Sequence, residues 1–130
     1  ECGVTTIFVN AALAGKQPVI YGDGTATRDY VYVEDVAEAT WLALGLRRSI
    51  VLNISSGQEI KVSELWRAVS SITGTELEPL RSAERPGDIY KSSLCPARAA
   101  EYLGCRATTS LATGLQKTVD YYHRKYMPHV

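Results

Sequence analysis

Apolar residues recur at helical spacing from the start of the chain. Val4, Ile7, Phe8 and Ala11 are three or four positions apart, and Gly15 follows them as a residue that typically ends helices. By the same criteria we expect helices from about Glu34 to Gly45, from Ser63 to Gly74, from Pro96 to about Leu103, and from Ser110 onward. The buried face predicted for the second helix consists of Val36, Ala37, Thr40, Trp41 and Leu44. For the last helix it consists of Leu111, Leu115, Val119 and Tyr122.

Three segments have the pattern of strands. Residues 19–21 form a short apolar run before a Gly-Asp-Gly turn, and residues 28–33 alternate as a second strand. Residues 50–54 are apolar except at Asn53, which fits a parallel strand covered on both faces. Residues 76–94 are expected to be irregular, because Pro79, Pro86 and Gly87 force turns.

This order of elements predicts an incomplete α/β fold, mostly helices with a few short strands. A buried parallel strand needs neighbours, and the chain supplies few, so a partner segment is expected to be absent. The first helix also lacks a cap or a lead-in segment. We therefore expect residues 1–130 to form one region of a larger protein.

Composition and charge narrow the possible partners and location. Lys plus Arg equals Asp plus Glu at 14 each, which argues against nucleic acid or an anionic membrane as the main partner. No apolar run approaches the ~18 residues of a membrane helix, and the first residues do not resemble a signal peptide. The spacing of Cys2, Cys95 and Cys105 favours reduced thiols and a cytoplasmic protein. His123 and His129 are too few for a zinc site.

The stretch from Tyr21 to Tyr30 has the most informative pattern. Its glycines allow backbone to approach a ligand closely, and Arg28 could direct a flat guanidinium at phosphate oxygens. An ordinary ion pair between Arg28 and Asp29 is the competing interpretation. The glycines do not have the GxGxxG spacing, and no helix is predicted directly after them, so this is not a dinucleotide-binding turn.

A second motif runs from Glu84 to Asp88. Pro-Gly fits the centre of a type II turn, which would present Arg85 and Asp88 from a rigid base. Arg85 could hold a phosphate and Asp88 a ribose hydroxyl, although a solvated surface ion pair would have the same sequence. Residues 53–57 could likewise contact a ligand at a strand end, or be a plain exit from the strand.

Residues for covalent catalysis are not apparent. The chain has no GxSxG elbow and no nucleophile tied to a histidine by motif. Tyr121 and Lys125 have the Tyr-x-x-x-Lys spacing, but they lie at the end of an amphipathic helix, far from any cofactor motif. We attribute that spacing to chance.

Taken together, the motifs resemble the extended short-chain dehydrogenase/reductase family, specifically the NAD-dependent nucleotide-sugar epimerases and dehydratases of the UDP-glucose 4-epimerase kind. The resemblance covers residues 18–39 most closely, and residues 52–57, 62–65, 85–88, 103–104 and 110–115 follow in the family's order. It implies a Rossmann-type fold whose N-terminal half, with the NAD site and the catalytic Tyr and Lys, is absent here. It also implies that Val19 and Tyr21 bind the base through backbone groups, that Arg28 and Arg85 hold the diphosphate, and that Asp88 holds a ribose hydroxyl.

Some positions depart from the family pattern. Ser55 replaces a common Gly, Cys95 a common helix-capping Asp, and Cys105 a common Trp. Three hypotheses follow. In the first, the chain is the nucleotide-sugar-binding part of an epimerase, dehydratase or decarboxylase, and this part alone binds no NAD and is inactive. In the second, it is a stand-alone module that binds nucleotide sugars. In the third, it is a structural remnant that self-associates through an exposed sheet flank.

Overall fold

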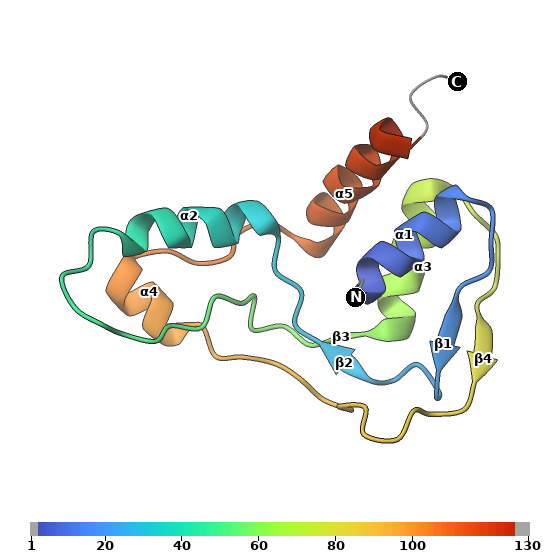
Figure 1. Cartoon of the computed structure of the whole chain (residues 1–130), viewed down its shortest axis with the longest axis horizontal. Coiled ribbons are helices and arrows are strands. Elements are labelled where there is room, and N and C mark those ends of the chain that lie inside the picture. Colours follow the sequence, from blue (N-terminus) through green and yellow to red (C-terminus); the bar gives the residue numbers. More distant parts are fainter. Residues whose placement is uncertain (1–2, 127–130) are drawn as a thin grey trace.

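The computed structural model describes residues 3–126, which form a helix-rich α/β fold, as predicted (Figure 1). The helices are α1 (Val4–Leu13), α2 (Val33–Ala43), α3 (Val62–Thr73), α4 (Ala97–Leu103) and α5 (Leu111–Tyr126). The strands are β1 (Val19–Tyr21), β2 (Thr27–Arg28), β3 (Ile60–Lys61) and β4 (Leu80–Ser82). They form two small sheets: β1 pairs with β4 in parallel, and β2 pairs with β3 antiparallel.

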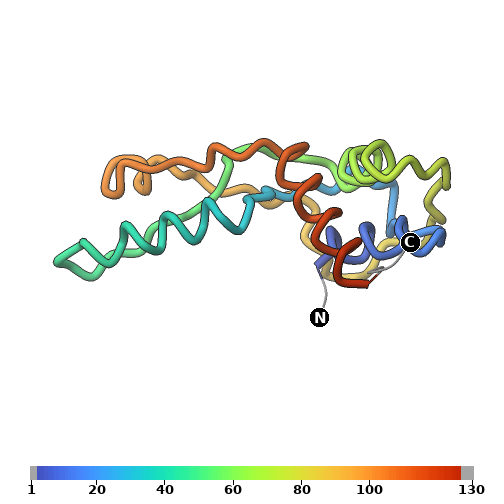
Figure 2. Tube along the Cα trace, turned by 90° about the horizontal axis from the view of Figure 1, so that it is seen from above, coloured from blue at the N-terminus to red at the C-terminus, as the bar shows by residue number. Residues whose placement is uncertain are grey.

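The core lies where α1, α3 and α5 pack together beside β1. Phe8 and Trp66 meet edge to face, with ring centroids 5.5 Å apart. Fully burying a large apolar side chain stabilises a fold by about 1.5–3 kcal/mol, so this cluster holds one end of the molecule together. Its buried members are Phe8, Val9, Ala12, Ile20, Leu65, Trp66, Val69, Leu115 and Val119. At the other end of the elongated molecule, α2 and α4 lie away from this core (Figure 2).

The predicted helices are present, with small shifts at their ends. Ser110 caps α5, because its hydroxyl accepts the Thr113 N–H at 3.1 Å. Gly74 and Gly104 end α3 and α4 in the left-handed conformation, at φ 69° and 66°. The prediction that Ser63 caps α3 was wrong. The N-cap is Lys61, two residues earlier, and the Glu64 carboxylate accepts the Lys61 N–H at 3.0 Å.

The predicted buried face of α2 was wrong. Trp41 is 74% exposed and Leu44, which follows the helix, is 76% exposed, whereas Asp35 and Ala39 are buried. The Asp35 carboxylate accepts the backbone N–H groups of Thr108 and Thr109, at 3.3 and 3.2 Å. The helix is therefore fixed through the face that carries Asp35 and Ala39, and within residues 3–126 no element covers Trp41 or Leu44. In α1 the buried residues are Phe8, Val9 and Ala12, while Ile7 of the predicted stripe is 48% exposed.

The strand predictions were the least accurate. Of residues 28–33, only Arg28 belongs to a strand, and the chain enters α2 at Val33. Residues 50–54 form no strand, and Val51 is 81% exposed, because no other described segment pairs with them. Conversely, β4 lies inside the segment expected to be irregular. Its parallel pairing with β1 is a long-range contact that local sequence does not signal.

Three further expectations concern cysteines, metals and membranes. The thiols of Cys95 and Cys105 are free, whereas Cys2 and His129 lie outside the described residues. Within residues 3–126, no cluster of His, Cys, Asp and Glu is arranged to hold a metal ion. None of the described helices is both long and apolar enough to cross a membrane.

Candidate functional site

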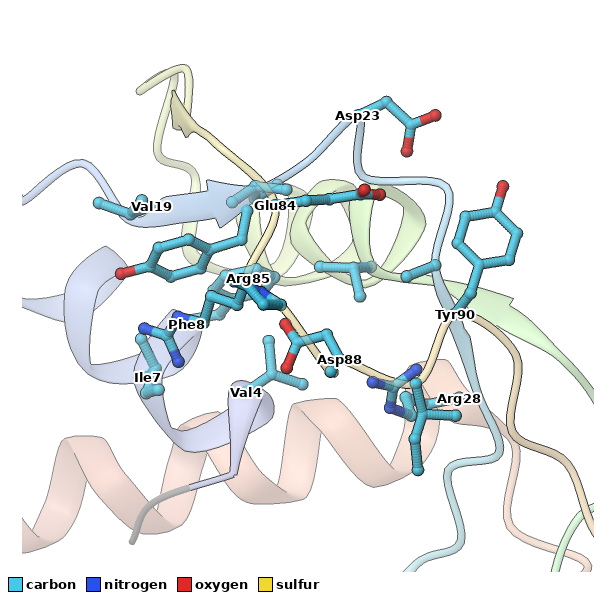
Figure 3. Close-up of a pocket in the computed structure, with 17 residues that line it drawn as sticks. Val4, Ile7, Phe8, Val19, Asp23, Arg28, Glu84, Arg85, Asp88 and Tyr90 are labelled. Carbon is cyan, nitrogen blue, oxygen red and sulfur yellow. The ribbon is translucent and has the colours of Figure 1, made fainter.

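The main cavity has a volume of about 800 Å³ and is lined mainly by three separate parts of the chain, together with Val62 of α3. One wall comes from α1, another from β1 and the segment leading into β2, and the third from residues 84–90 (Figure 3). All five residues singled out from the sequence, Val19, Tyr21, Arg28, Arg85 and Asp88, line this cavity. The fold therefore brings together residues that are up to 69 positions apart (88 − 19).

Parallel pairing of β1 with β4 produces this arrangement. Tyr21 lies opposite Ser82, and the Gly22 N–H donates to the Ser82 carbonyl at 2.9 Å. Because the strands run in parallel, the segments that follow each of them leave at the same end. Gly22 turns away at φ 70°, and an added Cβ there would meet the Glu84 side chain at 2.7 Å. The glycine thus lets the two exits pass close to one another.

A tight turn fixes the positions of Arg85 and Asp88. The Asp88 N–H donates to the Arg85 carbonyl at 3.2 Å, and Gly87 has φ 86°. Both features fit the type II turn predicted from Pro86-Gly87. In the view of Figure 3, the Arg85 side chain extends toward Ile7 of α1, and Asp88 lies between Arg85 and Arg28. The guanidinium carbon of Arg85 lies over the Tyr21 ring, 3.7 Å from its centroid.

Arg28 enters the cavity from β2. Its Nη1 donates to the Thr27 carbonyl at 2.8 Å, which fixes the direction of the side chain. The Asp29 carboxylate, its expected alternative partner, instead accepts hydrogen bonds from Ser56, Gly57 and Leu94. Burial raises the pKa of the neighbouring Tyr30 hydroxyl, and the positive charge of Arg28 partly opposes that rise.

The Asp29 carboxylate organises the segment that follows β2. Burial by itself would raise the pKa of this carboxyl, but hydrogen bonds from Ser56, Leu94 and Gly57 outweigh burial and lower it. Residues 53–57, considered as possible ligand contacts, do not line the main cavity. The backbone N–H groups of Ser56 and Gly57 instead donate to the Asp29 carboxylate, so this part of the loop stabilises the fold.

Several lining residues were not identified from the sequence. Val4, Ile7 and Phe8 contribute an apolar wall, and Asp23 and Tyr90 contribute polar groups at the rim. The Tyr90 hydroxyl is 2.7 Å from the Thr25 hydroxyl. Tyr90 follows the Arg85–Asp88 motif by two residues, so extending that motif could have identified it. The contribution of α1 depends on tertiary packing and has no local signal.

The Gly22–Gly24 turn is not of the kind that binds a dinucleotide. The Gly22–Gly24 turn connects β1 to β2, whereas a dinucleotide turn leads from a strand directly into a helix. Tyr121 and Lys125 lie in the last turns of α5, where Tyr121 is 53% exposed and neither residue lines the main cavity.

Comparison with known proteins gives a consistent result. The model of the NAD dependent epimerase/dehydratase family matches residues 1–55. UDP-glucose 4-epimerase of Mycolicibacterium smegmatis is 40% identical over 126 residues, which are 96% of this chain and 40% of that protein. A UDP-glucose 4-epimerase designated putative, from Methanocaldococcus jannaschii, is 37% identical over 121 residues, covering 93% of this chain and 39% of that protein.

Solved structures agree in fold. The crystal structure of UDP-glucose 4-epimerase from Thermotoga maritima, with UDP-glucose, superposes with a TM-score of 0.93 at 40% identity. The match covers 96% of this chain and 40% of that one. The chain thus spans about two fifths of the length of the relatives it matches. With motifs, fold and relatives in agreement, this chain belongs to the NAD-dependent epimerase/dehydratase family, among the extended short-chain dehydrogenase/reductases that include UDP-glucose 4-epimerase.

Proposed function

We propose that this chain is the nucleotide-sugar-binding part of an NAD-dependent sugar epimerase, and that its main cavity holds the nucleoside diphosphate. The observation that carries this proposal is the convergence of Val19, Tyr21, Arg28, Arg85 and Asp88 on one cavity of about 800 Å³. That volume falls within the roughly 300–1,000 Å³ typical of small-molecule sites.

The chemistry of the lining supports a nucleotide ligand. Arg28 and Arg85 enter from different segments, and guanidinium groups match phosphate oxygens in shape and charge. Asp88 offers a carboxylate that can accept a hydrogen bond from a ribose hydroxyl. Val4, Ile7 and Phe8 supply the apolar wall, and the backbone of β1 can donate to and accept from a base.

The exposed apolar residues support a second part of the proposal. Val33, Trp41, Leu44 and Val51 are between 68% and 81% exposed, and all lie in or beside α2 and residues 50–54. We infer that an NAD-binding half covers this region and supplies the Tyr and Lys that act on the sugar. Alone, the chain would bind substrate but leave it unchanged, because binding without a hydride acceptor and a base gives no reaction.

Titration of the chain with UDP and UDP-glucose, followed by calorimetry and by amide NMR, tests the binding proposal. We expect saturable binding with shift changes at Val19, Tyr21, Arg28 and Gly87. Comparison with dTDP and GDP would identify the preferred base. Saturable binding with shifts confined to residues outside the cavity would overturn the site assignment.

A chimaera tests the catalytic part. Joining this chain to the NAD-binding half of the Thermotoga maritima relative should restore conversion of UDP-glucose to its 4-epimer, whereas the chain alone should give none. Turnover by the purified chain would contradict the proposal. Loss of water from UDP-glucose, leaving a 4-keto-6-deoxy sugar, would point instead to dehydratase chemistry. Loss of carbon dioxide when UDP-glucuronic acid is supplied would point to decarboxylase chemistry.

A further inference from the structure

The side chain of Tyr21 contacts Arg85 and does not merely border the cavity. The guanidinium carbon of Arg85 lies 3.7 Å from the centroid of the Tyr21 ring, which places the flat group in contact with the ring. A cation over an aromatic face is held by the ring quadrupole, and arginine is well suited to it because its guanidinium is planar and weakly hydrated.

The ring is held on a rigid base. Tyr21 ends β1 directly after Ile20, which is only 1% exposed, and its backbone is in register with Ser82 of β4. Arg85, in contrast, begins an exposed turn and has a long side chain with many rotamers. Fixing such a side chain carries a substantial entropic cost, so a preformed contact reduces what a ligand must order.

Stacking and phosphate binding use different parts of the guanidinium. The ring contacts the central carbon of the group, whereas the N–H bonds lie in the plane of the guanidinium and point outward from its edge. The two interactions are therefore compatible in one geometry. From this we propose that the Tyr21 side chain is a positioning element that orients Arg85 for the diphosphate, in addition to any contact that the Tyr21 backbone makes with the base. This inference rests on the proposed nucleotide-binding function.

A double-mutant cycle provides the test. The affinity for UDP is measured for the chain and for Tyr21→Leu, Arg85→Ala and the double variant. Tyr21→Leu keeps an apolar side chain on the strand and removes only the aromatic face. We expect Tyr21→Leu to weaken UDP binding on the order of fivefold when Arg85 is present. In a chain that already carries Arg85→Ala, the same change should have little further effect. Tyr21→Phe keeps the ring and should recover the affinity that Tyr21→Leu loses.

Proton NMR supplies a readout independent of affinity. The Arg85 side-chain methylene protons should show upfield ring-current shifts that vanish in Tyr21→Leu and persist when UDP is bound. A fully additive cycle, or Arg85 shifts unaffected by Tyr21→Leu, would overturn the positioning role. If instead Arg85→Ala leaves UDP affinity unchanged, the proposed diphosphate site itself fails, so the two failures are distinguishable.

Discussion

Asp29 and Ser56 are joined twice across 27 positions of sequence: Oδ1 of Asp29 accepts the Ser56 backbone N–H at 2.9 Å and its hydroxyl at 2.6 Å. Oδ2 accepts the Gly57 N–H at 3.0 Å. One carboxylate thus ties the end of β2, which carries Arg28, to the loop before β3. The position of Arg28 in the cavity wall therefore depends on Asp29, which does not itself line the cavity.

Replacing Asp29 should destabilise the fold. Asp29→Ala removes a charged acceptor of several hydrogen bonds, so we expect the free energy of unfolding to fall by about 1.5–3 kcal/mol. Urea denaturation measures this change. Asp120→Ala, at an exposed position that accepts a hydrogen bond from Gln116, is the control and should stay within about 0.5 kcal/mol of the parent chain.

The contribution of Asp29 should depend on pH with a defined sign. Its pKa is lowered in the folded state, so the unfolded chain takes up the proton first as the pH falls. The stabilisation is complete above the unfolded value of about 3.9 and is lost as the pH drops through the lower folded value. Unfolding measured at pH 7 and near pH 3 should show the parent and Asp29→Ala converging in acid. An equal difference at both pH values would contradict this account.

Arg28 should contribute directly to diphosphate affinity. Removing one charged hydrogen-bonding group in Arg28→Ala should weaken UDP binding by about 1.5–3 kcal/mol, as measured by calorimetry. Arg47→Ala is a matched control, because Arg47 is exposed beyond α2 and does not line the cavity. Equal affinities for Arg28→Ala and the parent would remove Arg28 from the site.

Gly24 should tolerate no side chain. Its φ is +77°, and an added Cβ would lie 3.3 Å from both Ile20 and Ser63 and 2.5 Å from Nη1 of Arg81. Gly24→Ala should therefore lower the unfolding free energy by at least about 1–2 kcal/mol, the cost of a left-handed backbone. Gly45→Ala has an ordinary backbone and a nearest contact of 3.4 Å, so thermal denaturation should show little change for it.

The Tyr30 hydroxyl should contribute nothing to stability. Within residues 3–126 it is buried without a hydrogen-bond partner, and burial raises its pKa. Tyr30→Phe should leave the unfolding free energy unchanged or raise it, because it removes an unsatisfied polar group. The parent should lose stability above about pH 10, where the unfolded chain ionises first, and Tyr30→Phe should reduce that loss. A clear destabilisation at pH 7 would show that the hydroxyl is bonded.

The two tryptophans should report separately on the core and on the exposed end. Trp41 is 74% exposed and Trp66 is 4% exposed. Acrylamide should quench the fluorescence of Trp41 strongly in a Trp66→Phe variant and that of Trp66 weakly in a Trp41→Phe variant. In the chimaera with an NAD-binding half, Trp41 should become protected and its emission should shift to the blue. Unchanged quenching there would argue against that half covering α2.

Local sequence determined the helices and the 85–88 turn, and it singled out Arg28, Arg85 and Asp88 as candidate ligand residues. These depend on side-chain spacing, capping and backbone conformation within a few residues, which are properties of short segments. Tertiary structure alone decided that β4 pairs with β1, that Asp29 binds residue 56 and not Arg28, and that α2 is fixed through Asp35 with Trp41 outward. Each of these depends on which distant segment is present to form a hydrogen bond or bury a surface. The apolar pattern at residues 50–54 likewise forms a strand only where a neighbouring strand pairs with it.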